Sequence, residues 1–147
     1  MENRVNIQNA QPAAYKAMYG LEAFLAGTEL TKTQKELIKI RASQINGCAF
    51  CIDMHTKDAL KYGESAQRIF LLNAWRETDL FTEEEKVILA ITEEVTLIHQ
   101  NGLTAATYEK AKRFFSEDVI AQLIVAVVTI NAWNRIAIST NLPVPKG

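Results

Sequence analysis

The amino-acid sequence predicts an all-α fold of about six to seven helices. Apolar residues recur at helical spacing almost throughout the 147 residues. We find no convincing run of alternating β-branched residues bounded by turn signals, which a strand would need. Apolar residues make up 48% of the sequence and charged residues 22%, an ordinary balance for a globular protein. We therefore expect residues 1–147 to form a single domain with one packed core.

Turn and capping residues place these helices along the chain. Pro12 suits the first position of a helix and Gly27 a left-handed helix end, so the first helix is expected from about 12 to 26. The second begins near Thr31 or Thr33 and ends before a break at Asn46-Gly47. The third helix is expected from about 48 to 62, followed by a shorter helix that runs through 75 and by another from 82 to 99. Thr104 is expected to cap a further helix, and Ser116 to cap the last helix, which runs to about 139.

The last expected helix is apolar nearly all round, so several of its sides must be covered. Two arrangements are open: the helix is central to the core, or a partner subunit covers part of it. The same segment contains Gln122, Asn131, Asn134 and Arg135, which are costly at membrane depth. We therefore expect a buried helix and no membrane span.

Composition and charge argue against several classes of protein. The net charge is −1 and no basic stripe occurs, so nucleic-acid binding is not expected. The polar N-terminus, Met1 to Ile7, lacks the apolar stretch of a secretory signal, and we expect a cytoplasmic protein. Two cysteines three positions apart cannot form a disulfide framework of the secreted type. In a reducing compartment such a pair more often means redox chemistry or metal binding.

Cys48 and Cys51 stand at the start of the expected third helix. A helix N-terminus favours an anion, and a thiol attacks peroxide only as the thiolate, which favours Cys48 as the attacking group. Cys51 follows one turn later, so its sulfur can approach that of Cys48. Once one sulfur is oxidised, the other can trap it as a disulfide and protect it from further oxidation.

His55 and Glu36 are the candidate proton carriers. His55 lies four residues after Cys51, and helical side chains lean toward the N-terminus, so its imidazole can polarise that thiol. Glu36 reaches the cysteines only if its helix folds back. It can instead close a capping box with Thr33, although a box of Thr31 with Gln34 fits equally well and leaves Glu36 free.

A zinc site is an alternative use of the two cysteines and a histidine. A closed tetrahedral site needs a fourth ligand, and among nitrogen and sulfur donors only His99 remains. His99 stands where a cation would suit a helix C-terminus, so we interpret it as structural. We expect no metal and no bound cofactor.

One segment carries a specific family resemblance. It reads Glu36-Leu-Ile-Lys-Ile-Arg-Ala-Ser43-Gln-Ile-Asn-Gly-Cys48-Ala-Phe-Cys51-Ile-Asp-Met-His55. This segment resembles the core motif of the AhpD-like alkylhydroperoxidases, within the carboxymuconolactone decarboxylase family, in the spacing of Glu, Cys, Cys and His. Further matches extend over most of the chain, at 56–59, 63–64, 74–76, 82–85 and 131–135.

The resemblance implies an all-helical homo-oligomer, a hexamer or a trimer, in which Glu36 and His55 form a proton relay beside Cys48 and Cys51. It also implies that one cysteine attacks a hydroperoxide and that an external dithiol, such as a lipoylated protein, reduces the disulfide. The best-known AhpD enzymes carry a histidine immediately before the second cysteine, where this chain has Phe50. Decarboxylases of the family lack the paired cysteines, so lactone decarboxylation is not expected.

Three functions are compatible with these residues and with the family resemblance. The leading expectation is a thiol-dependent peroxidase of antioxidant defence that reduces hydrogen peroxide or organic hydroperoxides. The second is a thiol-disulfide reductase or redox-responsive binding protein without significant peroxidase activity. The third is a helical oligomerisation module with incidental thiols. Which cysteine attacks stays open, because the helix position favours Cys48 and the spacing to His55 favours Cys51.

Overall fold

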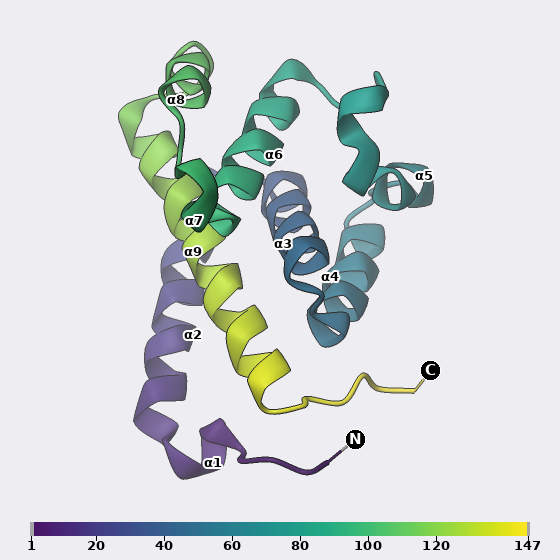
Figure 1. Ribbon diagram of the computed structural model, residues 1–147, viewed down its shortest axis with the longest axis vertical. Helices are drawn as coiled ribbons and strands as arrows, with labels where there is room; N and C mark the ends of the chain where they lie inside the picture. Colours follow the sequence, from purple (N-terminus) through teal and green to yellow (C-terminus); the bar gives the residue numbers. More distant parts are fainter. Residues whose placement is uncertain (1, 147) are drawn as a thin grey trace.

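The computed structural model describes residues 2–146, and within them the chain is helical and has no strand (Figure 1). The prediction of an all-α fold is therefore confirmed. The elements are α1 (Ile7–Ala10), α2 (Pro12–Ala26), α3 (Lys32–Asn46), α4 (Ala49–Lys61), α5 (Ala66–Phe70), η1 (Leu72–Glu77), α6 (Glu83–Thr96), α7 (Ile98–Asn101), α8 (Ala105–Lys112) and α9 (Glu117–Ser139).

The described residues contain more helical elements than the six to seven expected, because short ones were not anticipated. Asn6 caps the four-residue α1. The helix expected to run from 82 to 99 ends at Thr96, because Leu97 has φ −93° and ψ 43° and separates α6 from α7. The expectation for Gly27 was also wrong. Its φ of −90° lies outside the left-handed region, so α2 ends there without requiring a glycine.

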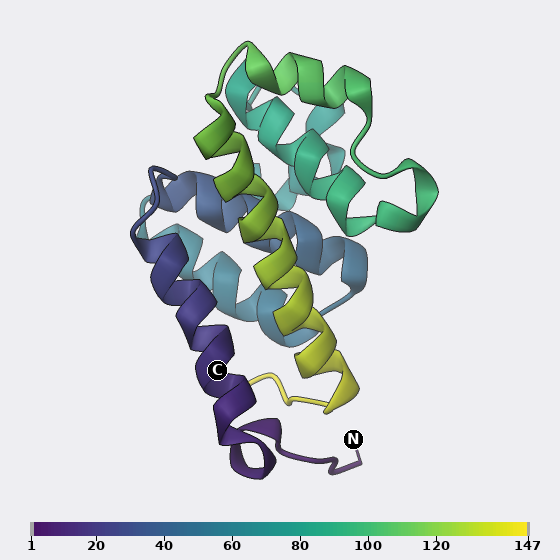
Figure 2. The same ribbon diagram turned by 90° about the vertical axis from the view of Figure 1, so that its left-hand side faces the viewer.

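The helix α3 is the centre of the domain. It packs against α4, α6 and α9, and α2 lies along α9 (Figure 2). Two buried clusters flank α3: one with α6, α8 and α9 that includes Ile38, Ile88 and Leu123, and one with α5, η1 and α6 that includes Leu37 and Leu72. Burial of these side chains fixes the path of α3, whose C-terminal end carries the cysteine turn.

The apolar helix α9 is only partly covered by the described residues. Leu123, Val127 and Ile130 are buried, whereas Val128 is 50% exposed and Ile138 is 44% exposed. Length and hydropathy alone make α9 a candidate membrane span, but the core helices of soluble proteins share these properties. The structure thus gives α9 a core side and an exposed apolar side, and the expected oligomer stays a prediction.

Glu93 on α6 joins three elements through one carboxylate. It accepts hydrogen bonds from Arg41 on α3 at 2.9 Å, from Trp75 Nε1 on η1 at 2.8 Å, and from Arg76. Burial raises the pKa of the Glu93 carboxyl, but these hydrogen bonds outweigh burial and hold the pKa below its ordinary value.

We predict that Glu93 makes stability depend on acid pH. Because its pKa is lower in the folded state, its contribution is complete above the unfolded value, 4.5, and disappears as pH falls through the folded value. Glu93→Gln should cost about 1–3 kcal/mol at neutral pH and much less once wild-type Glu93 is protonated. Urea unfolding at neutral and acid pH measures this. Glu109→Gln is the control, because Glu109 forms an exposed pair with Lys112 and its replacement should change stability little. If Glu93→Gln lowers the free energy of unfolding equally at both pH values, the prediction is contradicted.

Gly47 ends α3 in the left-handed conformation, with φ 70°. A Cβ there would meet no atom within 4 Å, so only backbone strain opposes a side chain. Gly47→Ala should therefore lower the free energy of unfolding by about 1–2 kcal/mol. Gly20→Ala, in the middle of α2 and also free of clashes, is the matched control and should raise stability by about 0.5–1 kcal/mol. Denaturant unfolding of both variants tests the opposite signs, and a harmless Gly47→Ala would refute the strain argument.

Candidate active site

Cys48 lies on the turn between α3 and α4, and Cys51 lies in the first turn of α4. Cys48 is the N-cap of α4, where its Sγ accepts a hydrogen bond from the Cys51 backbone N–H at 3.4 Å. The Cα atoms are 5.4 Å apart and the sulfurs form a disulfide. The expected approach of the two sulfurs within one helical turn is thus observed. Reduction of this disulfide to two thiols takes up two electrons.

Glu36 and His55 meet across the interface of α3 and α4. Thr31, not Thr33, is the N-cap of α3, and it forms a capping box with Gln34. Glu36 is therefore free of the cap, and its Oε2 lies 3.0 Å from Nδ1 of His55. Both side chains are buried. The structure therefore shows that α3 and α4 fold against each other and bring Glu36 to His55. Periodicity alone did not establish this contact.

This contact determines which nitrogen of His55 can take a proton. When Glu36 is ionised its carboxylate only accepts hydrogen bonds, and Nδ1–H of His55 is then the donor of this contact. Nε2 of the neutral imidazole then keeps its lone pair and can act as a base. The arrangement suits reversible proton transfer to a group beside His55.

A cavity of about 320 Å³ lies beside the disulfide and is partly open to solvent. Cys51 and His55 both contribute to its lining, together with Lys39 and Glu22. Cys48 lines a smaller hollow of about 170 Å³, and Phe50 contributes to the lining of both. Since the cysteines are 1% and 2% exposed, a small molecule in the larger cavity meets Cys51 and not Cys48.

The cavity wall opposite α4 is aromatic. Tyr15 and Tyr19 from α2 pack against Trp133 from α9, with ring centroids 5.2 Å and 5.8 Å from that of Trp133. Burial, together with the neighbouring Tyr19, raises the pKa of Tyr15 above its ordinary value. Neither Trp133 nor the two tyrosines was predicted from the sequence to line the site. Their residue types carried no signal of the site, because α2 and α9 are brought together only by the tertiary fold.

Charged groups continue from Glu36 along the cavity. Nζ of Lys39 is 3.5 Å from Oε1 of Glu36 and 4.0 Å from Oε2 of Glu22. Glu22 also accepts a hydrogen bond from Nε1 of Trp133 at 3.0 Å. The Glu36–His55 pair is therefore one end of a longer row of polar contacts that the sequence analysis missed.

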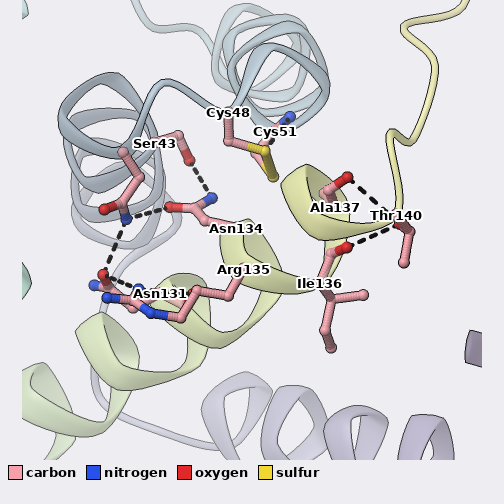
Figure 3. Close-up of a disulfide and its surroundings, with 10 residues drawn as sticks. Ser43, Cys48, Cys51, Asn131, Asn134, Arg135, Ile136, Ala137 and Thr140 are labelled. Carbon is pink, nitrogen blue, oxygen red and sulfur yellow. Dashed lines mark hydrogen bonds between the residues drawn. A yellow bond between two sulfur atoms is a disulfide. The ribbon is translucent and has the colours of Figure 1, made fainter. Parts of the chain in front are cut away.

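An amide network fixes the cysteine turn to α9 (Figure 3). Asn134 is fully buried; its Nδ2 donates to Oγ of Ser43 at 2.9 Å, and its Oδ1 accepts from Asn46 at 2.9 Å. Asn46 also donates to Asn131 at 2.9 Å. The disulfide faces Ala137 one turn further along α9. The network holds the last turn of α3 in place immediately before Cys48.

The zinc alternative gains no support from the placement of His99. This residue is exposed on α7, and residues 2–146 contain no group of three or more His, Cys, Asp or Glu side chains that is placed to hold a metal ion.

Comparison with known proteins agrees with the resemblance carried by the cysteine motif. The model of the carboxymuconolactone decarboxylase family matches residues 12–94, more than half of the chain. The uncharacterized protein YdfG of Bacillus subtilis (strain 168) is 42% identical over 139 residues, which cover 95% of each chain.

Solved structures show the same fold. A protein of unknown function from Agrobacterium tumefaciens, described as a candidate antioxidant defence protein AhpD, has a TM-score of 0.95 at 39% identity, covering 99% of this chain and 100% of that one. The debrominase Bmp8 has a TM-score of 0.82 at 17% identity, covering 94% of this chain and 74% of that one. At this lower identity, the second comparison shows the fold alone.

We predict that Asn134 stabilises the site through its two hydrogen bonds. Asn134→Ala leaves the buried Ser43 hydroxyl without its donor and should lower the free energy of unfolding by about 2 kcal/mol. Arg135→Ala, next in sequence, removes only exposed hydrogen bonds to Asn131 and should change it by about 0.5 kcal/mol or less. Urea unfolding compares the two, and equal effects would argue against a special role for the network.

Proposed function

Because the chain belongs to the carboxymuconolactone decarboxylase family, and its cysteine disulfide borders a cavity shared with His55, we propose that it is a thiol-dependent peroxidase that reduces hydroperoxides. The observation that carries the proposal is the joint lining of one cavity by Cys51 and His55, with His55 held by Glu36. A nucleophile, its base and the group that orients the base are thereby brought together.

In the reduced protein, His55 takes the proton of the Cys51 thiol. The thiolate attacks one oxygen of the hydroperoxide, the O–O bond breaks, and the alkoxide leaves as the alcohol with the proton from His55. Cys51 becomes a sulfenic acid. The thiol of Cys48 then attacks the Cys51 sulfur, water leaves, and the disulfide forms. In sum, one hydroperoxide and two thiols give one alcohol, one water and one disulfide.

We assign the attack to Cys51, although the N-cap position would favour the thiolate of Cys48. Access supports this choice, because Cys51 lines the larger cavity and Cys48 does not. Cys48 is then the resolving thiol. Its Cα lies 5.4 Å from that of Cys51, a separation that a disulfide can span.

The reductant proposed is an external dithiol, such as a lipoyl group, and no bound cofactor enters the cycle. Burial of both sulfurs supports a slender reductant, since a protein surface cannot reach them directly. The same burial weighs against the thiol-disulfide reductase that forms part of the second expected function. We further propose a cytoplasmic homo-oligomer, a trimer or a hexamer, in which the exposed apolar side of α9 meets a partner subunit.

Thiol-dependent debromination of a brominated aromatic compound is a second candidate, favoured by the aromatic wall and the fold shared with Bmp8. The Cys51 thiolate would attack bromine, the aromatic carbon would take a proton, and Cys48 would displace bromide as the disulfide forms. Release of bromide from 2,3,4-tribromopyrrole, the compound bound in one structure of Bmp8, without rapid oxidation by hydroperoxide, would favour this candidate.

Rapid mixing of reduced protein with limiting cumene hydroperoxide tests the peroxidase. The wild type should lose two thiols per peroxide, much faster than free cysteine does. Cys51→Ser should react no faster than free cysteine. Cys48→Ser should keep the first step, stop at the sulfenic acid and overoxidise with excess peroxide.

His99→Gln is the control and should leave the wild-type rate unchanged, because His99 is exposed outside the cavity. A Cys51→Ser variant that keeps rapid oxidation, or wild-type thiols as slow as free cysteine, would refute the peroxidase proposal.

A further inference from the structure

Four ionisable side chains from three helices form a row along the cavity: Glu22 on α2, Lys39 and Glu36 on α3, and His55 on α4. Lys39 lies between the two carboxylates and lines the cavity together with Cys51 and His55. Its side chain is 17% exposed, so solvent screens its charge only in part. The peroxidase cycle proposed above assigns no role to Lys39.

The position of Lys39 affects the base. A carboxylate beside an imidazole favours the imidazolium form, which cannot accept the proton of a thiol. The ammonium of Lys39, 3.5 Å from the oxygen of Glu36 that does not face His55, offsets that carboxylate charge. The positive charge of Lys39 therefore opposes protonation of His55, whose neutral form acts as the base.

We propose that Lys39 is a positioning residue that sets the pH at which His55 accepts the proton of Cys51, and that Glu22 moderates its effect. Glu22 acts in the opposite sense, since its carboxylate, 4.0 Å away, partly neutralises Lys39. The proposal rests on the acid–base role of His55 proposed above.

No other side chain that lines the cavity supplies a positive charge in place of Lys39. From α2 the cavity also receives Tyr15 and Tyr19, whose phenol groups cannot carry a positive charge. Among the cavity-lining residues of α9, Trp133, Ile136 and Ala137 have no titrating side chain, and α4 adds Cys51. Lys39 is thus the cation that this lining places beside Glu36.

The test is an NMR pH titration of the disulfide form, in which the cysteines do not titrate. The sequence has two histidines, so His99, exposed on α7, serves as an internal control in every sample. Lys39→Met removes the cation and should move the midpoint of the His55 titration to higher pH by about one unit. Glu22→Gln should move it to lower pH by about half a unit. Lys39→Arg, which keeps the charge, should restore the wild-type midpoint.

A His55 midpoint that is unchanged in both Lys39→Met and Glu22→Gln, or that moves in the same direction in both, overturns the proposal. If Lys39→Met does not fold, the proposal is tested by the other two variants. A lower His55 midpoint in Glu22→Gln together with a wild-type midpoint in Lys39→Arg supports it, and an unchanged midpoint in Glu22→Gln overturns it. The measurement uses no peroxide. A protein without peroxidase activity can still show the shifts, and an active peroxidase without them refutes the role of Lys39 alone.

Discussion

A buried carboxylate has to be paired, and the pairing of Glu36 with His55 is the constraint on which the site depends. Removing a carboxylate from water costs several kcal/mol unless hydrogen bonds and opposite charge compensate it. His55 and Lys39 provide that compensation from α4 and from the next turn of α3. The two helices are consequently held in one register, and His55 is held beside Cys51.

The remaining elements place the cysteines and the cavity beside the Glu36–His55 pair. Gly47 turns the chain so that Cys48 caps α4, and the amides of Asn46 and Asn134 tie that turn to α9. The helix α2, which contributes little to the buried core, completes the cavity with Tyr15 and Tyr19. Cys51 lines this cavity, whereas Cys48, which packs with Cys51 and Ala137, is not part of its lining, an arrangement consistent with the separate roles proposed for the two sulfurs.

Local signals in the sequence predicted much of this structure. Pro12, Ser116 and the helical apolar spacing gave helix positions close to those observed, because caps and periodicity act within a few residues. The confirmed family membership came from the spacing between Glu36 and His55. Splitting of the helix at Leu97 was missed, because no glycine or proline marks it.

The parts that depend on long-range packing were not predictable in this way. The choice between Thr31 and Thr33 as the cap, on which the freedom of Glu36 depends, was even in the sequence, and the structure has Thr31 as the cap. Glu22 and Trp133 are separated by 111 positions and meet only because α2 lies along α9. No local pattern reports such a contact, so the aromatic wall and the position of Lys39 emerged only from the structure.

The central claim is that Glu36, through His55, activates Cys51. Its most direct test is the rate constant for oxidation of reduced Glu36→Gln by limiting hydroperoxide, compared with the wild type at the same pH. The amide keeps the size of the side chain but not its charge, so the account predicts a loss of about 10-fold or more with the fold retained. A folded Glu36→Gln protein that reacts at the wild-type rate would contradict it.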